Sequence, residues 1–357
     1  MESTFEPGQL LSEFAVTPTA APYGNGHIND TYVCEMPRYI IQRINTRIFK
    51  DPDALMDNIV RVTAFLREKL AAAGEDPARG TLTVIPTRGG RPYLRVDDEH
   101  VYRVYAFIEG TVTVENCSDP VYLTEAGRGY GRFQKMLADF PAETLHETIP
   151  DFHDTPKRLA AFEKAVATDK AGRAAAVEKE IAFVRENADL APCVTEGLCD
   201  GRIPLRVTHN DTKMNNILFD AASKKAVCVI DLDTVMPGSA LYDFGDALRL
   251  GGSSAAEDEV DLSKVFFREE AFKAFVSGYF AEMKASLTDA EKALLPRSVA
   301  LMTYECGMRF LTDYLEGDVY FKVRREEHNL DRARNQFKLV ADMREKEKDM
   351  LAFVKTL

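Results

Sequence analysis

Two short polar segments carry residues whose types and spacing suit the transfer of a phosphoryl group. The first reads VTHNDTKMNN over residues 207–216 and contains Asp211 and, five positions later, Asn216. The second reads AVCVIDLD over residues 226–233, an apolar run followed by Asp231. Phosphoryl transfer needs a carboxylate beside the attacking hydroxyl and oxygen ligands for the Mg²⁺ on the nucleotide phosphates. The pattern therefore predicts Asp211 as the catalytic base, and Asn216 and Asp231 as ligands of Mg²⁺ bound to ATP.

Taken one at a time, these residues have a simpler interpretation, because Asp and Asn in loops usually cap helices or form turns. The prediction rests on the complete order HxDxxxxN followed by IDxD. Leu205 to Asp211 is typical of a strand that runs into a loop, which would place the carboxylate at the end of the strand. Asp243 and Asp246, by contrast, are expected to be structural anchors at the start of a helix.

The elements that must position these segments fall into two parts of different pattern. Before Gly110, apolar runs bounded by Gly and Pro turns predict strands, with one helix that begins at Asp51-Pro52 and ends near Gly74. The predicted strands cover residues 14–23, 28–36, 39–44, 82–86, 92–96 and 101–107. After Gly110 the apolar residues recur at helical spacing. The predicted helices cover residues 122–137, 156–166, 174–187, 242–250, 270–283, 296–310 and 331–354.

This order of elements predicts an α+β fold of the bilobal, protein-kinase-like type. Residues 1–109 would form a small, strand-rich lobe that binds the nucleotide. Residues 110–357 would form a larger helical lobe that holds the catalytic loop and the acceptor pocket. The candidate hinge between them is Glu109-Gly110.

The strand-rich lobe supplies the predicted contacts to ATP. The nucleotide is expected between the lobes, with its adenine hydrogen-bonded to the backbone of Phe107, Ile108 and Glu109. Gly24 and Gly26, in the segment YGNGHIN, would allow the backbone to approach the phosphates closely. A plain hairpin turn explains the same two glycines equally well.

The third predicted strand lacks the lysine with which protein kinases hold the α- and β-phosphates. Gln42 and Arg43 stand there instead, and on an alternating strand they face opposite sides. If Arg43 faces the cleft, it can replace the lysine as a nucleotide-binding cation. If Gln42 does, phosphate binding relies on the metal and the backbone. The sequence leaves both possibilities open.

Composition excludes several other classes of protein. With 45% hydrophobic and 29% charged residues, the 357-residue chain is typical of a soluble globular protein. Its net charge of −12 argues against nucleic-acid binding, which needs a basic face. No stretch approaches the roughly 18 apolar residues that span a membrane. The six Cys form no CxxC pair and the N-terminus has no secretory pattern, so we expect free thiols in the cytoplasm. The sequence does not determine the oligomeric state, and we expect a monomer.

The motifs are similar to those of the aminoglycoside phosphotransferase/choline kinase family, small-molecule kinases with a protein-kinase-like fold. Within it, residues 207–246 most closely resemble the N-acetylhexosamine 1-kinases. The resemblance extends to PYGNGHIND at 22–30, RVYAFIEG at 103–110, FHDTPKR at 152–158 and ECGMRFLTDYLEGDVYF at 305–321. It therefore runs through most of the chain.

This resemblance implies the same catalytic and metal-binding roles for Asp211, Asn216 and Asp231, and it adds a sugar as the acceptor. The acceptor would be N-acetylglucosamine or N-acetylgalactosamine, phosphorylated at the anomeric oxygen, whose hydroxyl is acidic enough for an ordinary carboxylate base. The resemblance implies that the sugar is bound by His27, Asn29, Asp211, Asp233, Arg309 and Tyr320. On helical spacing alone, Arg309 could instead belong to an exposed ladder of salt bridges with Glu305 and Asp313.

Two other functions stay open. A kinase of the same fold could phosphorylate another alcohol, such as homoserine, choline, methylthioribose or an aminoglycoside. An acidic pocket would favour the cationic acceptors among these, and Arg309 in the pocket would disfavour them. A non-catalytic, nucleotide-binding pseudokinase is the other possibility, and the intact Asp211, Asn216 and Asp231 argue against it. The preferred sugar epimer, the strictness of the N-acetyl requirement and the number of metal ions are not determined by the sequence.

Overall fold

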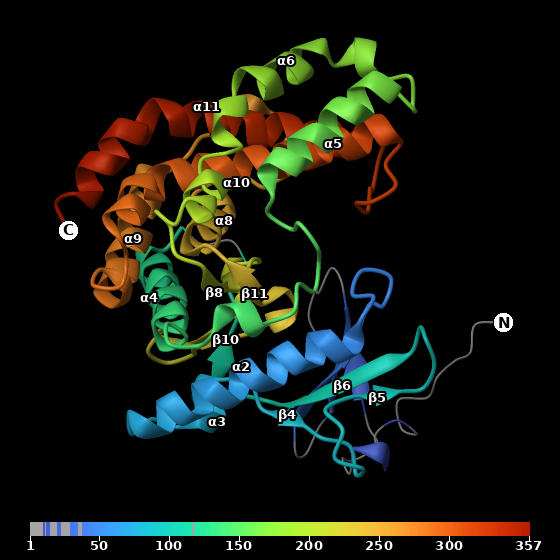
Figure 1. Cartoon of the computed structure of the whole chain (residues 1–357), viewed down its shortest axis with the longest axis vertical. Helices are drawn as coiled ribbons and strands as arrows, with labels where there is room; N and C mark the ends of the chain where they lie inside the picture. Colours follow the sequence, from blue (N-terminus) through green and yellow to red (C-terminus); the bar gives the residue numbers. More distant parts are fainter. Residues whose placement is uncertain (1–9, 11, 15–19, 23–28, 35–37, 116–117) are drawn as a thin grey trace.

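The computed structural model describes residues 10, 12–14, 20–22, 29–34, 38–115 and 118–357. Within these residues, an antiparallel sheet and one long helix make up the N-terminal part, and helices make up most of the rest (Figure 1). The prediction of an α+β fold with a strand-rich N-terminal part is confirmed.

The N-terminal sheet has the strand order β1-β2-β3-β6-β4, and β5 also pairs with β6. Its strands are Ala20–Pro22 (β1), Asp30–Cys34 (β2), Tyr39–Arg43 (β3), Val84–Ile85 (β4), Leu94–Arg95 (β5) and Val101–Ala106 (β6). All of its pairs are antiparallel. The described strands lie within the predicted ones, and Phe14, predicted to begin the first strand, lies in a turn. Residues 15–19, 23–28 and 35–36 of the first two predicted strands and the turn between them lie outside the described residues.

The helix α2 (Pro52–Ala72) packs on one face of this sheet. Asp51 caps it by accepting a hydrogen bond from the Ala54 amide at 3.0 Å, and a proline occupies its first position. The buried side chains of α2 join a core that continues into the helical part of the chain. Asn58, on the buried face, donates to the Val235 carbonyl oxygen at 3.0 Å. The helix therefore lies between the sheet and the remaining elements, as Figure 1 shows.

Helices form the larger part of the molecule. They are Pro77–Gly80 (α3), Pro120–Met136 (α4), Thr155–Thr168 (α5), Glu178–Glu186 (α6), Thr195–Cys199 (α7), Ala240–Gly251 (α8), Glu269–Met283 (α9), Asp289–Glu316 (α10) and His328–Val354 (α11). The long α10 begins with a capping box of Thr288 and Glu291 and ends at Gly317, which has a positive φ of 99°. The helices α4 and α9 touch through their backbones, because a Cβ on Gly278 would lie 1.8 Å from the Thr124 carbonyl oxygen.

Two short sheets bring the polar motifs together. One has the order β10-β9-β7, with strands Thr111–Val112 (β7), Ile217–Asp220 (β9) and Ala226–Val229 (β10). The other pairs Arg206–Thr208 (β8) with Met236–Gly238 (β11). In the β9–β10 hairpin, Ile217 lies opposite Val229. The residue before β9 and the residues after β10 are therefore neighbours, which explains how two separate motifs reach one place.

Two findings concern the thiols and the helices of the described part. Cys193, Cys199, Cys228 and Cys306 are free thiols, as predicted. None of the helices in the described part of the chain has the length and apolar character needed to cross a membrane.

Candidate active site

The loop after β8 is held rigidly by two carboxylates of α8. Asp243 accepts hydrogen bonds from the backbone amides of His209 and Asn210 at 2.9 and 2.7 Å. Asp246 accepts one from the amide of Thr212 at 2.8 Å. Both carboxylates are buried, so each bond replaces one that water would otherwise supply. The prediction that Asp243 and Asp246 are structural anchors is confirmed, and they fix the backbone on both sides of residue 211.

Asp211 projects from this loop with its side chain 21% exposed. The Lys213 Nζ lies 2.7 Å from its Oδ1, and the Asn216 Nδ2 lies 3.3 Å from its Oδ2. Burial would raise the pKa of Asp211, but the Lys213 ammonium outweighs burial and holds that pKa below its ordinary value. Asp211 is therefore an ionised carboxylate that still reaches solvent, as a base acting on a bound hydroxyl must be.

Asn216 directly precedes β9, and Asp231 follows the end of β10, the strand that pairs with β9. The Ile230 amide donates to the Asn216 carbonyl oxygen at 2.9 Å, and the His209 Nε2 donates to the Ile230 carbonyl oxygen at 2.8 Å. These bonds connect the second motif to the loop after β8. They bring Asp231, the residue after Ile230, close enough to Asp211 for the two carboxylates to influence each other.

The donor set at this point fits Mg²⁺ that arrives with a nucleotide. Asn216 uses its amide NH₂ on the Asp211 backbone oxygen at 2.7 Å, which leaves its side-chain carbonyl as the oxygen that can face a cation. Burial, together with the Asp233 and Asp211 carboxylates, raises the pKa of Asp231 to about 6, an environment that a cation would relieve. No group of three His, Cys, Asp or Glu side chains among the described residues is arranged to hold a metal alone. Two protein oxygens plus phosphates is the usual arrangement for Mg²⁺.

The Asp233 carboxylate binds side chains of the N-terminal part of the chain. Its Oδ2 accepts a hydrogen bond from the Asn29 Nδ2 at 2.6 Å, and its Oδ1 lies 2.5 Å from the Arg103 Nη1. The side chain is only 5% exposed. Asn29 and Asp233 were both predicted to bind the acceptor sugar. Here they bind each other, and neither oxygen of Asp233 faces open space.

The sheet register shows which residue of β3 faces Asp231 and Asp233. Gln42 lies opposite Arg103, whereas Arg43 lies opposite Tyr102 on the other face. Arg43 pairs with Asp30 at 2.5 Å, and its side chain is 43% exposed. The prediction that Arg43 contacts the phosphates is therefore not supported, because strand alternation points it away from Asp231.

Several backbone groups of the candidate hinge, where adenine was predicted to bind, already form hydrogen bonds within the protein. The Glu109 carbonyl oxygen accepts from Arg79 at 2.7 Å, and the Ile108 carbonyl oxygen accepts from the Thr111 hydroxyl at 2.8 Å. The Phe107 amide donates to the Arg38 carbonyl oxygen at 3.1 Å. The predicted adenine contacts to Phe107, Ile108 and Glu109 remain a proposal. The bonds described here reduce the number of backbone groups in these residues that are available to adenine.

Arg309 lies among aromatic rings. Its guanidinium carbon is 5.5 Å from the centre of the Phe152 ring, 5.9 Å from that of Tyr320 and 5.6 Å from that of Phe321. Tyr320 is 59% exposed, so one face of this cluster is open to solvent. The salt-bridge ladder is not formed, because the carboxylate of Asp313 accepts from backbone amides of residues 319–321 instead.

Glu305, the other residue of that helix face, is buried against a histidine. The His153 Nδ1 lies 2.8 Å from the Glu305 Oε1, and its Nε2 lies 3.2 Å from the Asn210 carbonyl oxygen. A carboxylate and a carbonyl oxygen can only accept, so both contacts are satisfied when both ring nitrogens carry a proton. His153 outweighs the effect of burial and holds the pKa of Glu305 below its ordinary value. His153 thereby ties α10 to the catalytic loop beside Asp211.

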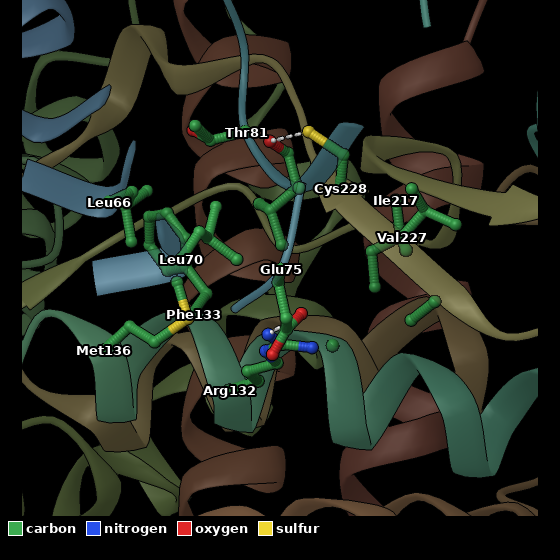
Figure 2. A pocket seen from close by; sticks show the side chains of 14 residues that line it. Leu66, Leu70, Glu75, Thr81, Arg132, Phe133, Met136, Ile217, Val227 and Cys228 are labelled. Atoms are coloured by element: carbon green, nitrogen blue, oxygen red, sulfur yellow. Dashed lines mark hydrogen bonds and ion pairs between the residues drawn. The ribbon is translucent and has the colours of Figure 1, made fainter. Parts of the chain in front are cut away.

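A separate cavity of about 50 Å³ lies between the end of α2, α4 and the β9–β10 hairpin (Figure 2). Apolar side chains such as Leu66 line most of it, and an ion pair between Glu75 and Arg132 lies at its edge. Ligand sites usually exceed roughly 300 Å³. Burial raises the pKa of the Cys228 thiol in its wall to about 12, so that thiol is neutral and unreactive. This cavity is a gap in packing and not part of the site.

Three predicted residues, Gly24, Gly26 and His27, lie outside the described residues. Three others were missed. Lys213 lies two positions after Asp211, and Arg103 is the only charged residue of the largely buried strand β6. Either feature could have drawn attention. Nothing in the sequence separates His153 from an ordinary loop histidine.

Comparison with known proteins agrees with this geometry. The model of the phosphotransferase enzyme family matches residues 19–275. A microcompartment-associated aminopropanol kinase is 19% identical, with a TM-score of 0.65, and the match covers 96% of this chain and 97% of that one. An amicoumacin kinase in complex with AMP-PNP and Ca²⁺ is 13% identical, with a TM-score of 0.58 and coverage of 97% and 94%. A choline kinase from Cryptosporidium parvum Iowa II is 14% identical, with a TM-score of 0.57 and coverage of 93% and 90%. These solved structures share the fold.

Proposed function

Because the chain belongs to the phosphotransferase enzyme family and is a small-molecule kinase, we propose that it transfers the γ-phosphoryl group of ATP to the anomeric hydroxyl of an N-acetylhexosamine. The products are the sugar 1-phosphate and ADP. The segments that resemble N-acetylhexosamine 1-kinases support this acceptor, since they include the catalytic loop and the α10 block.

The observation that carries the acceptor assignment is the position of Arg309. Aromatic rings commonly bind the substituted ammonium of a cationic acceptor. In this chain the rings of Phe152, Tyr320 and Phe321 already surround the Arg309 guanidinium. A second cation would be repelled there, whereas the hydroxyl and acetyl oxygens of a neutral sugar can accept hydrogen bonds from a guanidinium.

In the proposed reaction, the anomeric oxygen of the sugar attacks the γ-phosphorus of ATP, and ADP leaves. Asp211 accepts the proton that the anomeric hydroxyl loses. Lys213 keeps the carboxylate ionised, and the bonds from Asp243 and Asp246 keep it in place. Mg²⁺ held by Asn216 and Asp231 would neutralise charge on the phosphates.

Strand pairing supports the proposed lobe boundary at residues 109–110. The strand β6 ends at Ala106 within the N-terminal sheet, and β7 begins at Thr111 and pairs with β9. ATP would lie between the two, with Gly24, Gly26 and His27 covering the phosphates and the sugar.

An acceptor panel tests this proposal. Release of ADP would be measured with N-acetylglucosamine, N-acetylgalactosamine, glucose, galactose, choline, ethanolamine and aminopropanol, with Asp211→Asn as the background control. We expect an N-acetylhexosamine to have the highest kcat/KM and NMR to locate the phosphate on the anomeric oxygen. A phosphate at any other carbon, or turnover confined to amino alcohols, would refute the proposal.

A second candidate, an amino-alcohol kinase, is favoured by one observation. A cleft of about 460 Å³ lies beside Asn210 and has four carboxylates in its lining. They are Glu143, Glu147, Asp151 and Asp154. Acidic linings attract cationic acceptors. Lys157, however, lies 2.6 Å from Asp151 and 3.1 Å from Asp154, and it neutralises part of that charge. The sugar therefore remains the first candidate, and the same panel separates the two.

A further inference from the structure

Among the described strands of the N-terminal sheet, the face that points to Asp233 carries no lysine, but it does carry a cation. Gln42 occupies the β3 position on this face, and Arg103 of β6 lies directly opposite it in the register. Directly opposed residues of an antiparallel pair have Cβ atoms about 5 Å apart. A side chain from position 103 therefore starts from nearly the same place as one from position 42.

Arg103 is fixed in one orientation. Gln42 Oε1 accepts hydrogen bonds from its Nε at 3.0 Å and its Nη2 at 2.9 Å. The third nitrogen, Nη1, lies 2.5 Å from Asp233 Oδ1. The Arg103 side chain is 1% exposed. Because both ends of the guanidinium are held, it cannot turn away from Asp233 without breaking bonds at the other end.

Stability alone explains this arrangement poorly. A buried ion pair rarely stabilises a fold more than apolar residues of the same volume, because both charges lose their hydration. Glutamine at position 42 adds a further, partly buried polar side chain, which also donates to the Thr31 hydroxyl at 3.3 Å. Three polar side chains in a row across one sheet face point to a task that requires a positive charge at a defined position.

The task concerns the turn that bears Asp231. Asp233 lies two residues after Asp231, in the single helical turn Leu232–Thr234. Its carboxylate is held by Arg103 and Asn29, and its backbone oxygen accepts from the Thr148 hydroxyl at 2.9 Å. Arg103 is therefore one of the contacts that hold this turn against the N-terminal sheet.

We propose that Arg103 is a positioning residue: through Asp233 it holds the turn that bears Asp231 at a set distance from the N-terminal sheet, so that the phosphates of Mg·ATP can bind between the turn and the sheet. This inference rests on the ATP-dependent kinase activity and goes beyond it. It concerns the nucleotide and not the acceptor, so it stands or falls separately from the choice of sugar.

The test moves the positive charge across the strand pair. Arg103→Gln removes the positive charge. Arg103→Lys keeps the charge but lacks the several donors of a guanidinium. Gln42→Lys combined with Arg103→Gln places the charge on β3 instead of β6. Binding of a non-hydrolysable ATP analogue with Mg²⁺ would be measured by calorimetry, alongside KM for ATP. The matched control is Arg47→Gln, since Arg47 is 84% exposed in the same part of the chain.

We expect Arg103→Gln to weaken binding of the analogue at least tenfold and Arg103→Lys to weaken it less. The double variant should recover at least threefold relative to Arg103→Gln, and Arg47→Gln should bind like the wild type. A purely structural role for Arg103 would lower thermal stability without changing the affinity of the folded protein, and Gln42→Lys would then rescue nothing.

Wild-type affinity in folded Arg103→Gln, or absence of rescue in the double variant, would overturn the inference. If Arg103→Gln does not fold, Arg103→Lys and the double variant decide it by the same affinity criterion. Failure of the wild type itself to bind the analogue would count against ATP use, and so against the kinase activity rather than against Arg103.

Discussion

Replacement of Asp231 by Asn is expected to make the protein more stable and, at the same time, inactive. Burial and the carboxylates of Asp233 and Asp211 raise the pKa of Asp231 from 3.8 to about 6. An acid whose pKa is higher in the folded state favours folding while it is protonated, and this contribution is lost as the pH rises through about 6. At about 1.4 kcal/mol for each pH unit, ionised Asp231 lowers the free energy of unfolding by up to about 3 kcal/mol at pH 8.

Asparagine removes the charge and keeps the shape. Asp231 has a φ of 60°, in the left-handed region that Asn adopts more readily than most residues, so the backbone should not be strained. We expect Asp231→Asn to raise the free energy of unfolding in urea at pH 8 by up to about 3 kcal/mol. The gain should shrink towards zero at pH 4, where the wild-type carboxyl is protonated. The control is Asp98→Asn at a fully exposed position, which should change stability by less than about 0.5 kcal/mol at either pH.

Magnesium provides a second arm of the same experiment. Mg²⁺ with the ATP analogue should stabilise the wild type more at pH 8 than at pH 5, because the metal competes with the proton for Asp231. It should stabilise Asp231→Asn little at either pH. If Asp231→Asn is less stable than the wild type at pH 8, or if the difference is the same at pH 4, the carboxylate is not held in an unfavourable environment and the reasoning fails.

Three further predictions concern the base, the histidine and the helix contact. Asp211→Asn should lower kcat by about 10²- to 10⁴-fold in protein that still unfolds cooperatively in urea, and near-normal turnover would remove the base assignment. His153→Phe leaves Glu305 buried without its partner and should cost about 3 kcal/mol, part of which Glu305→Gln in the same chain should restore in a double-mutant cycle. Additive effects of these two changes would contradict the pairing. Gly278→Ala should cost at least about 3 kcal/mol in urea unfolding, because its Cβ would meet the Thr124 carbonyl oxygen at 1.8 Å. Gly89→Ala, which meets only a flexible side chain, is its control, and equal stability of the two variants would be inconsistent with close α4–α9 packing.

Local pattern was sufficient to predict most of the elements. Capping residues and apolar spacing located α2, and the same spacing located α4, α5 and α9. Phe14 differs from its prediction, because it lies in a turn and packs with Ile41 and Val104 in a small core on the outer face of the sheet. An apolar residue in a short segment does not reveal which element it will pack against.

The candidate site was predictable where its residues are close in sequence and not where they are distant. Asp211 and Asn216 lie in one loop, and the hairpin from β9 to β10 brings Asp231 back to them. The partners of Asp233, by contrast, come from residues 29 and 103, which are far away along the chain. Strand alternation showed that Gln42 and Arg43 face opposite sides, but only the pairing with β6 and the position of α2 determine which side is buried. A buried ion pair between distant segments leaves no periodic signal in the sequence.

The charges around the catalytic loop explain why stability and substrate binding should be linked in this protein. Among the three carboxylates Asp211, Asp231 and Asp233, only two have a cation of the described residues in direct contact, Lys213 for Asp211 and Arg103 for Asp233. Asp231 therefore carries the surplus negative charge of this group. Water screens such a surplus poorly where groups are buried. A divalent cation alone would bring more positive charge than this negative surplus, and a nucleotide alone would add further negative charge. The surplus is relieved best by a ligand that brings metal and phosphate together, which is the form in which a kinase receives ATP.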